Sequence, residues 1–261
     1  YLSMSENHFA DRLTEAIKSK RTPLVVGIDP RVHQLPEPLA IDPATAAPNA
    51  IAQQVEVYAR GVIDAVADLV PAVKPQAAFF EQLGPYGCMA LANVVDHAKA
   101  KGLIVVMDAK RGDIGSTAEA YAAAYLGAKP HSTWGCDCLT VNPYMGDDTL
   151  TPFVDAANRT GSGLFVLAKT SNPGSDWIQA RPTDGQAVHH LVADEIQRLS
   201  AASAGASGYG NIGAVVGATY PDQLTELRRR MPNTIFLIPG FGAQGGTATD
   251  VAGGLDDNGL G

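Results

Sequence analysis

The sequence predicts a single (β/α)8 barrel, and two patterns lead to that prediction. Short apolar runs rich in β-branched residues recur along the 261-residue chain. Continuous runs of this kind are typical of parallel strands that are buried on both faces. Helical periodicity fills the gaps between the runs, and roughly 250 residues is a common length for one such barrel. A doubly wound open sheet remains an alternative, because both folds alternate strands with helices.

Seven strands are expected in order along the chain. Five of them are clear apolar runs, and they cover residues 24–28, 103–107, 163–168, 212–217 and 234–238. Two weaker strands are expected at residues 69–73 and 138–141. Each weaker run is followed by a polar residue and a proline, Lys74-Pro75 and Asn142-Pro143. Proline disfavours continued pairing, so these dipeptides mark the strand exits.

Apolar residues at three- and four-residue steps predict the intervening helices. An N-terminal helix carries Phe9, Leu13 and Ile17 ahead of the first strand. Two longer stripes consist of Ile51, Val55, Tyr58, Val62, Val66 and Leu69, and of Val188, Leu191, Val192, Ile196 and Leu199. A further helix follows Thr219, with Pro221 in its first turn and with Leu224, Leu227 and Met231 on its buried face.

The barrel prediction requires one more strand than the sequence contains. After a glycine-rich turn and a short segment at residues 247–255, an eighth strand would be due near Gly261. An open barrel would leave strand edges unpaired. We therefore expect residues 1–261 to form one barrel domain whose eighth strand is missing from the recorded sequence. Residues 1–3 precede Met4 and are interpreted as an addition ahead of the natural start.

Composition excludes several classes of function. The formal net charge of −8, from 19 Lys and Arg against 27 Asp and Glu, argues against nucleic-acid binding, which relies on a basic surface. No apolar run approaches the roughly 20 residues of a membrane helix. Three cysteines cannot all pair within one chain, and the segment before Pro23 lacks a signal peptide's apolar core. A reducing cytoplasm is the expected location. Cys136 and Cys138 supply only two thiols, so no metal site is predicted.

Polar residues follow most of the predicted strands, at the edge where barrel enzymes place their chemistry. Asp108 and Lys110 follow the strand at 103–107 and are two residues apart, a spacing that points both side chains to one side of an extended chain. Asp113 begins the turn into the next helix. An ordinary surface salt bridge is the alternative for an Asp-x-Lys-x-x-Asp pattern, and the position after a buried strand argues against it.

The charge pattern indicates what Lys110 can do. Opposite charges about 4 Å away favour the ammonium form by about 4 kcal/mol each at an effective dielectric near 20. Lys110 between Asp108 and Asp113 is therefore expected to donate a proton. A Schiff-base lysine needs desolvation or a cationic neighbour instead, so aldolase-type chemistry at Lys110 is disfavoured.

Six segments resemble the longer bacterial subgroup of the orotidine 5'-monophosphate decarboxylase family. The most specific is VMDAKRGDIGSTAEAYA, which contains Asp108, Lys110 and Asp113. The others, in chain order, are VVGIDPR, KPQAAFFEQLG, LTVNPYMGDD, LAKTSNPGSD and IPGFGAQGG. The resemblance implies a (β/α)8 barrel that converts orotidine 5'-monophosphate to uridine 5'-monophosphate without a cofactor, in the last step of de novo pyrimidine synthesis.

The resemblance also implies roles for residues of the subunit's own barrel. Asp29 and Lys74 would hold the ribose hydroxyls, and Lys74 would join a charged chain with Asp108 and Lys110. Asp108 would face the substrate carboxylate, and Lys110 would protonate C6 after carbon dioxide leaves. Ser171 would contact the pyrimidine ring.

The remaining implied contacts involve a second subunit and the phosphate. The family forms homodimers, in which Asp113 and Thr117 would reach into the neighbouring subunit's site. The phosphate would bind the glycine-rich loop at Gln244, Gly245 and Gly246, although glycines there could also simply form a tight turn. The family places a phosphate-binding arginine on the final strand, which this sequence lacks.

Two other functions remain open. A magnesium-dependent phosphosugar decarboxylase or aldolase on a related barrel could use the same acidic residues as metal ligands. The continuation KRGDIGST argues against that reading. A non-catalytic nucleotide-binding barrel is the second alternative, because the strand with the phosphate-binding arginine is absent.

Overall fold

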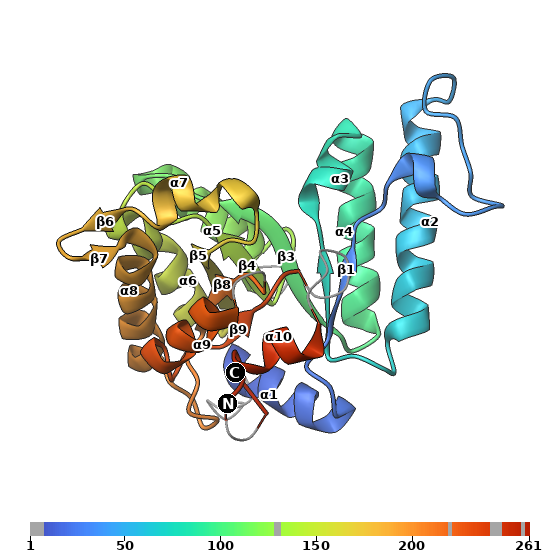
Figure 1. The fold of residues 1–261 in the computed structure, drawn as a ribbon. Coiled ribbons are helices and arrows are strands. Elements are labelled where there is room, and N and C mark those ends of the chain that lie inside the picture. Colours follow the sequence, from blue (N-terminus) through green and yellow to red (C-terminus); the bar gives the residue numbers. More distant parts are fainter. Residues whose placement is uncertain (1–7, 128–131, 219–220, 241–246, 257–258) are drawn as a thin grey trace. The chain divides into compact units, whose positions relative to one another are not determined.

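The computed structural model describes residues 8–127, 132–218, 221–240, 247–256 and 259–261 (Figure 1). The strands are β1 (Val25–Ile28), β2 (Ala72–Pro75), β3 (Ile104–Arg111), β4 (Cys138–Val141), β5 (Gly163–Lys169), β6 (Pro182–Thr183), β7 (Gln186–Ala187), β8 (Ile212–Val216) and β9 (Phe236–Leu237). The α-helices are α1 (Phe9–Lys20), α2 (Pro48–Val66), α3 (Ala77–Glu81), α4 (Gly84–Ala100), α5 (Gly115–Tyr125), α6 (Thr151–Thr160), α7 (Asp176–Gln179), α8 (Val188–Ala202), α9 (Pro221–Arg230) and α10 (Ala248–Ala252). Short 3-10 helices cover Val32–Gln34, Asp147–Leu150 and Pro173–Ser175.

The main sheet follows the order of the chain. Within the described residues it has seven strands, in the order β1-β2-β3-β4-β5-β8-β9. The pairings of β1 with β2, β2 with β3, β5 with β8 and β8 with β9 are all parallel. A doubly wound sheet reverses its strand order at a switch point, whereas a (β/α)8 barrel does not. The strand order therefore confirms the predicted architecture, and each of the seven predicted strands has a counterpart.

The chain forms two compact units. The first unit comprises Glu15–Ala109 and Ala123–Leu139, and the second comprises Tyr1–Thr14, Lys110–Ala122 and Thr140–Gly261. The chain passes from the first to the second between Ala109 and Lys110, inside β3, and again between Leu139 and Thr140, inside β4. Among the described residues, no helix is both long and apolar enough to cross a membrane.

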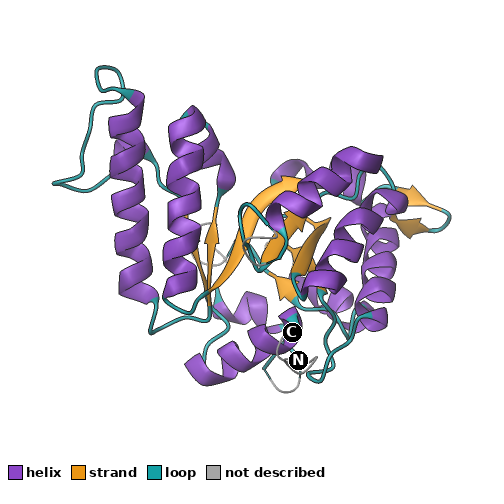
Figure 2. Cartoon of the chain, turned by 180° about the vertical axis from the view of Figure 1, so that it is seen from behind, coloured by secondary structure: helices purple, strands orange, loops and turns teal. Residues whose placement is uncertain are grey.

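In the first unit, the long helices α2 and α4 pack side by side (Figure 2). The buried stripe of α2 consists of Ile51, Ala52, Val55, Ala59 and Ile63. Leu69, which the sequence placed on this stripe, is 64% exposed, so that assignment is wrong. The helix ends at Val66, whose carbonyl accepts from the N–H groups of Leu69 and Val70. This turn also moves β2 three residues later than predicted, because the strand can begin only after it.

In the second unit, α8 packs on β5 and β8. The rings of Phe9 and Phe165 pack directly against the backbone of these strands at Gly163 and Gly213. A Cβ at these two glycines would lie 2.1 Å and 2.5 Å from the rings of Phe9 and Phe165, respectively. Those two rings meet edge to face with centroids 6.1 Å apart. The β6-β7 hairpin was not predicted, because each of its strands has only two residues.

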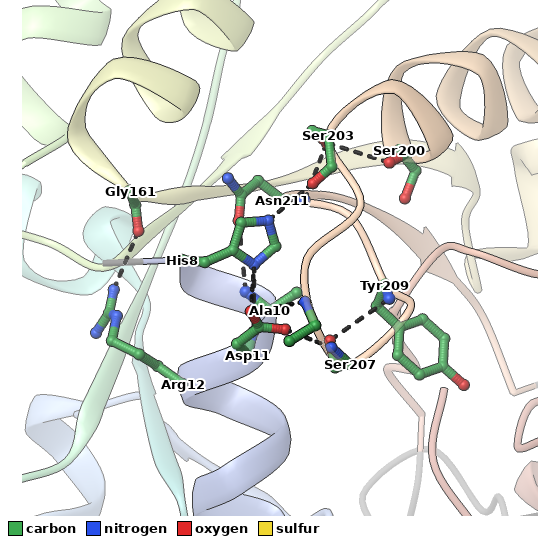
Figure 3. Close-up of polar contacts among 11 residues, drawn as sticks. His8, Ala10, Asp11, Arg12, Gly161, Ser200, Ser203, Ser207, Tyr209 and Asn211 are labelled. Carbon is green, nitrogen blue, oxygen red and sulfur yellow. Dashed lines mark hydrogen bonds and ion pairs between the residues drawn. The ribbon is translucent and has the colours of Figure 1, made fainter. Parts of the chain in front are cut away.

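The start of α1 is joined to the loop before β8 by polar contacts (Figure 3). The carboxylate of Asp11 accepts from the backbone N–H groups of Ala206 (3.0 Å) and Ser207 (2.7 Å). His8 Nε2 lies 2.8 Å from the carbonyl oxygen of Ser203. Burial opposes ionisation of Asp11, but the hydrogen bonds from Ser207 and Ala206 outweigh burial and lower the pKa of this carboxyl group. The charged form of Asp11 therefore stabilises the loop.

Replacing Asp11 by asparagine should lower the free energy of unfolding by about 1 kcal/mol at neutral pH, because charge-assisted hydrogen bonds are lost. The pKa of Asp11 is lower in the folded chain than in the unfolded chain. The stabilisation that Asp11 provides is therefore complete above the unfolded pKa of about 3.9, and it declines as pH falls through the folded pKa. Urea unfolding at neutral pH and at about pH 3 should show the difference from wild type shrinking with acidity. The exposed Glu15 of the same helix provides the control Glu15→Gln. A difference that is constant with pH would contradict the assigned role.

Candidate active site

The predicted site residues are divided between the two units. Asp29, Lys74 and Asp108 belong to the first unit. Lys110, Asp113, Thr117 and Ser171 belong to the second. Gln244, Gly245 and Gly246, predicted to hold a phosphate, lie outside the described residues.

Asp108 is the centre of the polar cluster in the first unit. The residue is only 6% exposed, and its Oδ2 accepts from Lys74 Nζ at 2.9 Å and from Gln76 Nε2 at 2.9 Å. A buried carboxylate is costly unless it is paired and hydrogen-bonded, and both conditions are met here. The predicted pairing of Lys74 with Asp108 is therefore present.

Strand register explains how these side chains meet. Gly27 of β1 pairs with Lys74 of β2, and the N–H of Gln76 donates to the carbonyl oxygen of Ile28. Gln76 also forms a parallel bridge with Asp108. Asp29 follows Ile28 directly and is exposed at the same edge. Three neighbouring strands thus bring Asp29, the Lys74 and Gln76 pair, and Asp108 to their carboxyl ends.

Gln76 is a site residue that the sequence reasoning missed. It stands two residues after Lys74, so both side chains leave the chain on the same side. That spacing is the same signal that linked Asp108 with Lys110, and it could have identified Gln76.

Lys110 has an unusual backbone conformation in the second unit. Its φ is +48°, in the left-handed region that side chains other than glycine seldom adopt. Its backbone N–H donates to Thr140 Oγ1 at 2.9 Å. The alternation rule used to place Asp108 and Lys110 on one side assumes a regular extended strand, and Lys110 does not meet that assumption. Its side-chain direction is set by local geometry instead.

Asp113 and Thr117 lie where β3 leads into α5. Asp113 Oδ1 accepts from the N–H of Ile114 at 2.8 Å, and Thr117 is exposed in the first turn of the helix. Ile114 between them is 61% exposed. Thr117 is therefore exposed at the surface of the described chain, whereas Asp113 is half-buried.

Ser171 follows β5 and lies close to the end of β8. A Cβ at Gly217 would come within 2.9 Å of the Ser171 backbone nitrogen and Cα, so only glycine allows this approach. The Gly217 N–H donates to the carbonyl oxygen of Lys169 at 2.8 Å. Gln179 bonds Thr170 twice, through the Thr170 N–H at 2.9 Å and Oγ1 at 2.8 Å. The segment that carries Ser171 is therefore fixed on both sides.

Lys169, to which the sequence assigned no role, anchors this segment. It is completely buried, and its Nζ lies 2.8 Å from Ser175 Oγ and 2.6 Å from Asp176 Oδ1. His189 adds a further link through Nδ1, 2.7 Å from the carbonyl oxygen of Gln179. Burial is the main reason that the pKa of His189 is lowered, so this residue is neutral near pH 7.

The described residues contain no group of three or more His, Cys, Asp or Glu side chains that could hold a metal ion. Asp108 is instead occupied by nitrogen donors from Lys74 and Gln76.

Comparison with known proteins identifies the family. The family model described as "Orotidine 5'-phosphate decarboxylase / HUMPS family" matches residues 23–258. The chain belongs to this family. The orotidine 5'-phosphate decarboxylase of Rhodopirellula baltica is 52% identical over 255 residues, which are 97% of this chain and 84% of that protein.

Solved structures of the decarboxylase family agree with the fold. The OMP decarboxylase of Leishmania donovani is 34% identical, with a TM-score of 0.73 over 96% of this chain and 85% of that one. The UMP synthase of Leishmania donovani is 36% identical, with a TM-score of 0.77 over 97% of this chain. This chain spans only 50% of that synthase. The family that the sequence motifs resemble is thus confirmed.

Proposed function

We propose that this chain decarboxylates orotidine 5'-monophosphate to uridine 5'-monophosphate, the last step of de novo pyrimidine nucleotide synthesis. The observation that carries the proposal is the buried Asp108 held by Lys74 and Gln76, two residues ahead of Lys110 in the chain. The 52% identity to a relative named orotidine 5'-phosphate decarboxylase supports the choice of substrate. The family description covers more than one activity, and that relative favours the decarboxylase.

The proposed reaction breaks the bond between C6 and the carboxylate of the substrate. Carbon dioxide leaves, and the electron pair of the broken bond stays on C6. The Lys110 ammonium stabilises this charge without reorganising and then transfers a proton to C6. The amine regains its proton from water. No cofactor is needed, because the lysine supplies both the charge and the proton.

The other residues bind and orient the substrate. Asp29 and Lys74 hold the ribose hydroxyls, and Ser171 contacts the pyrimidine ring. Asp108 faces the departing carboxylate, where a nearby negative charge raises the energy of the bound substrate relative to the transition state. Gln244, Gly245 and Gly246 bind the phosphate, whose binding energy offsets this strain.

A homodimer completes the proposed site, with Asp113 and Thr117 serving the neighbouring subunit. Exposed apolar side chains support this assembly. Ile114 is 61% exposed, and Tyr144 and Met145 are 76% and 47% exposed after β4. The two segments are neighbours, since a Cβ at Gly112 would lie 2.9 Å from the carbonyl oxygen of Asn142. Apolar groups of this size beside Asp113 fit a surface that a second subunit covers.

The proposed location is the cytoplasm. The three cysteines form no disulfide, and Cys136 and Cys138 are buried as thiols. The substrate is a soluble nucleotide, and the negative net charge of −8 gives no support for nucleic acid as a partner.

Loss of orotidine 5'-monophosphate absorbance in the presence of EDTA tests the proposed function. The wild-type protein should convert the nucleotide at the same rate with and without the chelator. Activity on a phosphosugar that disappears with EDTA would identify the magnesium-dependent alternative instead. A wild-type protein that binds uridine 5'-monophosphate but leaves the substrate unchanged would be the non-catalytic barrel.

A further inference from the structure

The conformation of Lys110 sets it apart from the other residues of its strand. Three described residues other than glycine have a positive φ: Arg21, Lys110 and Asp184. Arg21 and Asp184 lie in turns, where left-handed residues reverse the chain. Lys110 lies inside β3, where pairing with a neighbour favours an extended backbone. Strain of this kind persists only where the surrounding structure enforces it, and it gathers at functional sites.

The side chain of Thr140 contacts the backbone of Lys110. The N–H of Lys110 donates to Thr140 Oγ1, a side-chain oxygen, whereas a regular parallel ladder uses a backbone carbonyl. Thr140 is 1% exposed in β4, whose four residues are all buried. Its branched Cβ leaves χ1 few choices, so the hydroxyl has a fixed position.

The chain is also fixed immediately after Lys110. The carbonyl oxygen of Arg111 accepts from the N–H of Asn142 at 2.8 Å. Gly112 packs so tightly against Asn142 that a Cβ would lie 2.9 Å from the Asn142 carbonyl oxygen. Lys110 is therefore held on its N–H side by Thr140 and on its carboxyl side by the end of β4.

From this geometry we infer that Thr140 is a positioning residue, whose hydroxyl holds Lys110 in the left-handed conformation that directs its ammonium group to the reacting carbon. The inference rests on the proposed function. Changing φ from an extended value to +48° redirects the Cα–Cβ bond, and with it the base of a long flexible side chain. Thr140 itself is buried and acts through the Lys110 backbone, so it affects the orientation of the proton donor and not the binding of the nucleotide.

Thr140→Val tests the inference, because valine keeps the shape and removes the acceptor. We expect kcat to fall about 10- to 100-fold with KM changed less than about 3-fold, since a misplacement near 1 Å costs up to about 100-fold in rate. Thr140→Ser keeps the hydroxyl and should retain kcat within about 3-fold of wild type. If Thr140→Val does not fold, Thr140→Ala takes its place, because alanine also removes the hydroxyl and adds no volume. The alanine variant should then show the same fall in kcat.

Thr234→Val is the matched control. Thr234 is also completely buried in the second unit, and its hydroxyl lies 3.2 Å from Gln197 Oε1. Loss of the Thr234 hydroxyl should lower the free energy of unfolding and leave kcat unchanged. Hydrogen exchange at the Lys110 amide adds a readout that needs no turnover: exchange should be about 10-fold faster in Thr140→Val, and unchanged in Thr234→Val.

The results distinguish a failure of the inference about Thr140 from a failure of the proposed function. A folded Thr140→Val variant that keeps its kcat would overturn the inference and leave the proposed function intact. Equal losses in the valine and serine variants would also overturn it, because keeping the hydroxyl would then not preserve kcat. An inactive wild-type protein would contradict the proposed function itself, and the positioning role with it.

Discussion

Replacing Lys110 by alanine should reduce kcat for orotidine 5'-monophosphate by at least about 1,000-fold. Two contributions are lost together. A positioned proton donor supplies roughly 100- to 10,000-fold, and a preorganised charge at the developing anion supplies roughly 100- to 1,000-fold. KM should change little, since the ammonium acts mainly on the charge that forms in the transition state. The decrease in substrate absorbance measures both constants.

Lys101→Ala is the control for the loss of a lysine. Lys101 pairs with Asp64 at 2.7 Å, and its side chain is 42% exposed in the turn after α4. This variant should retain the wild-type kcat, because exposed ion pairs contribute little even to stability. Full activity of Lys110→Ala would show that the proposed mechanism is wrong, while the family assignment would stand.

Mixing two inactive variants extends this prediction to the shared site. A heterodimer of Lys110→Ala and Asp113→Ala subunits would contain one site with both native residues. Random exchange should then restore about a quarter of wild-type activity, because half of the dimers are mixed and each has one intact site. Light scattering establishes the dimer, and tagged subunits establish the exchange. Confirmed exchange without recovered activity would contradict the sharing of Asp113.

The strands, and the positions of Asp29, Lys74 and Asp108 at their ends, could be predicted because they depend on patterns within short segments of the sequence. Buried parallel strands require continuous apolar runs, and parallel strands bring their carboxyl ends to one edge. The position of Lys74 and Asp108 at one edge of the sheet could therefore be predicted from the strands, while their pairing was implied by the family resemblance. The exact length of α2 could not, because Leu69 continues the helical period while the chain has already turned.

The remaining features depend on register and backbone conformation, which have no signature in a single sequence. A threonine in a strand usually signals β propensity, so Thr140 gave no hint that its hydroxyl binds the Lys110 backbone. A positive φ can be expected at glycine but not at lysine. Lys169 directly follows the predicted strand at residues 163–168, and its complete burial depends on a partner that follows seven residues later.

Asp176→Ala should lower the free energy of unfolding by about 2 kcal/mol, although Asp176 itself is largely exposed. Its carboxylate lies 2.6 Å from Lys169 Nζ, and the Lys169 side chain is only 1% exposed. Breaking a buried ion pair from one side costs roughly 3 to 5 kcal/mol, and water around the 54% exposed Asp176 side chain reduces this figure. Urea unfolding at a fixed protein concentration measures the change, since the stability of the proposed dimer would depend on concentration.

Exposed Asp155 in α6 provides the control, and Asp155→Ala should change stability by less than about 0.5 kcal/mol. The variant Lys169→Met replaces the buried charge with a flexible apolar chain. Once the ammonium is absent, the carboxylate of Asp176 no longer has a buried charge to balance. The double variant, Lys169→Met with Asp176→Ala, should therefore be about 1 to 2 kcal/mol more stable than the sum of the two single losses of stability predicts.

Activity separates a structural role of this ion pair from a functional one. Residues 170–175, which include Ser171, lie between the two charged partners, and the Lys169 Nζ also contacts Ser175. If the pair orients Ser171, the double variant should bind the nucleotide more weakly, with KM raised about 3- to 10-fold and kcat nearly unchanged, because Lys110 is unaffected. Additive effects on stability would show that Lys169 and Asp176 do not interact in solution. An unchanged KM in the double variant would restrict the pair to folding and leave Gln179 to hold the segment.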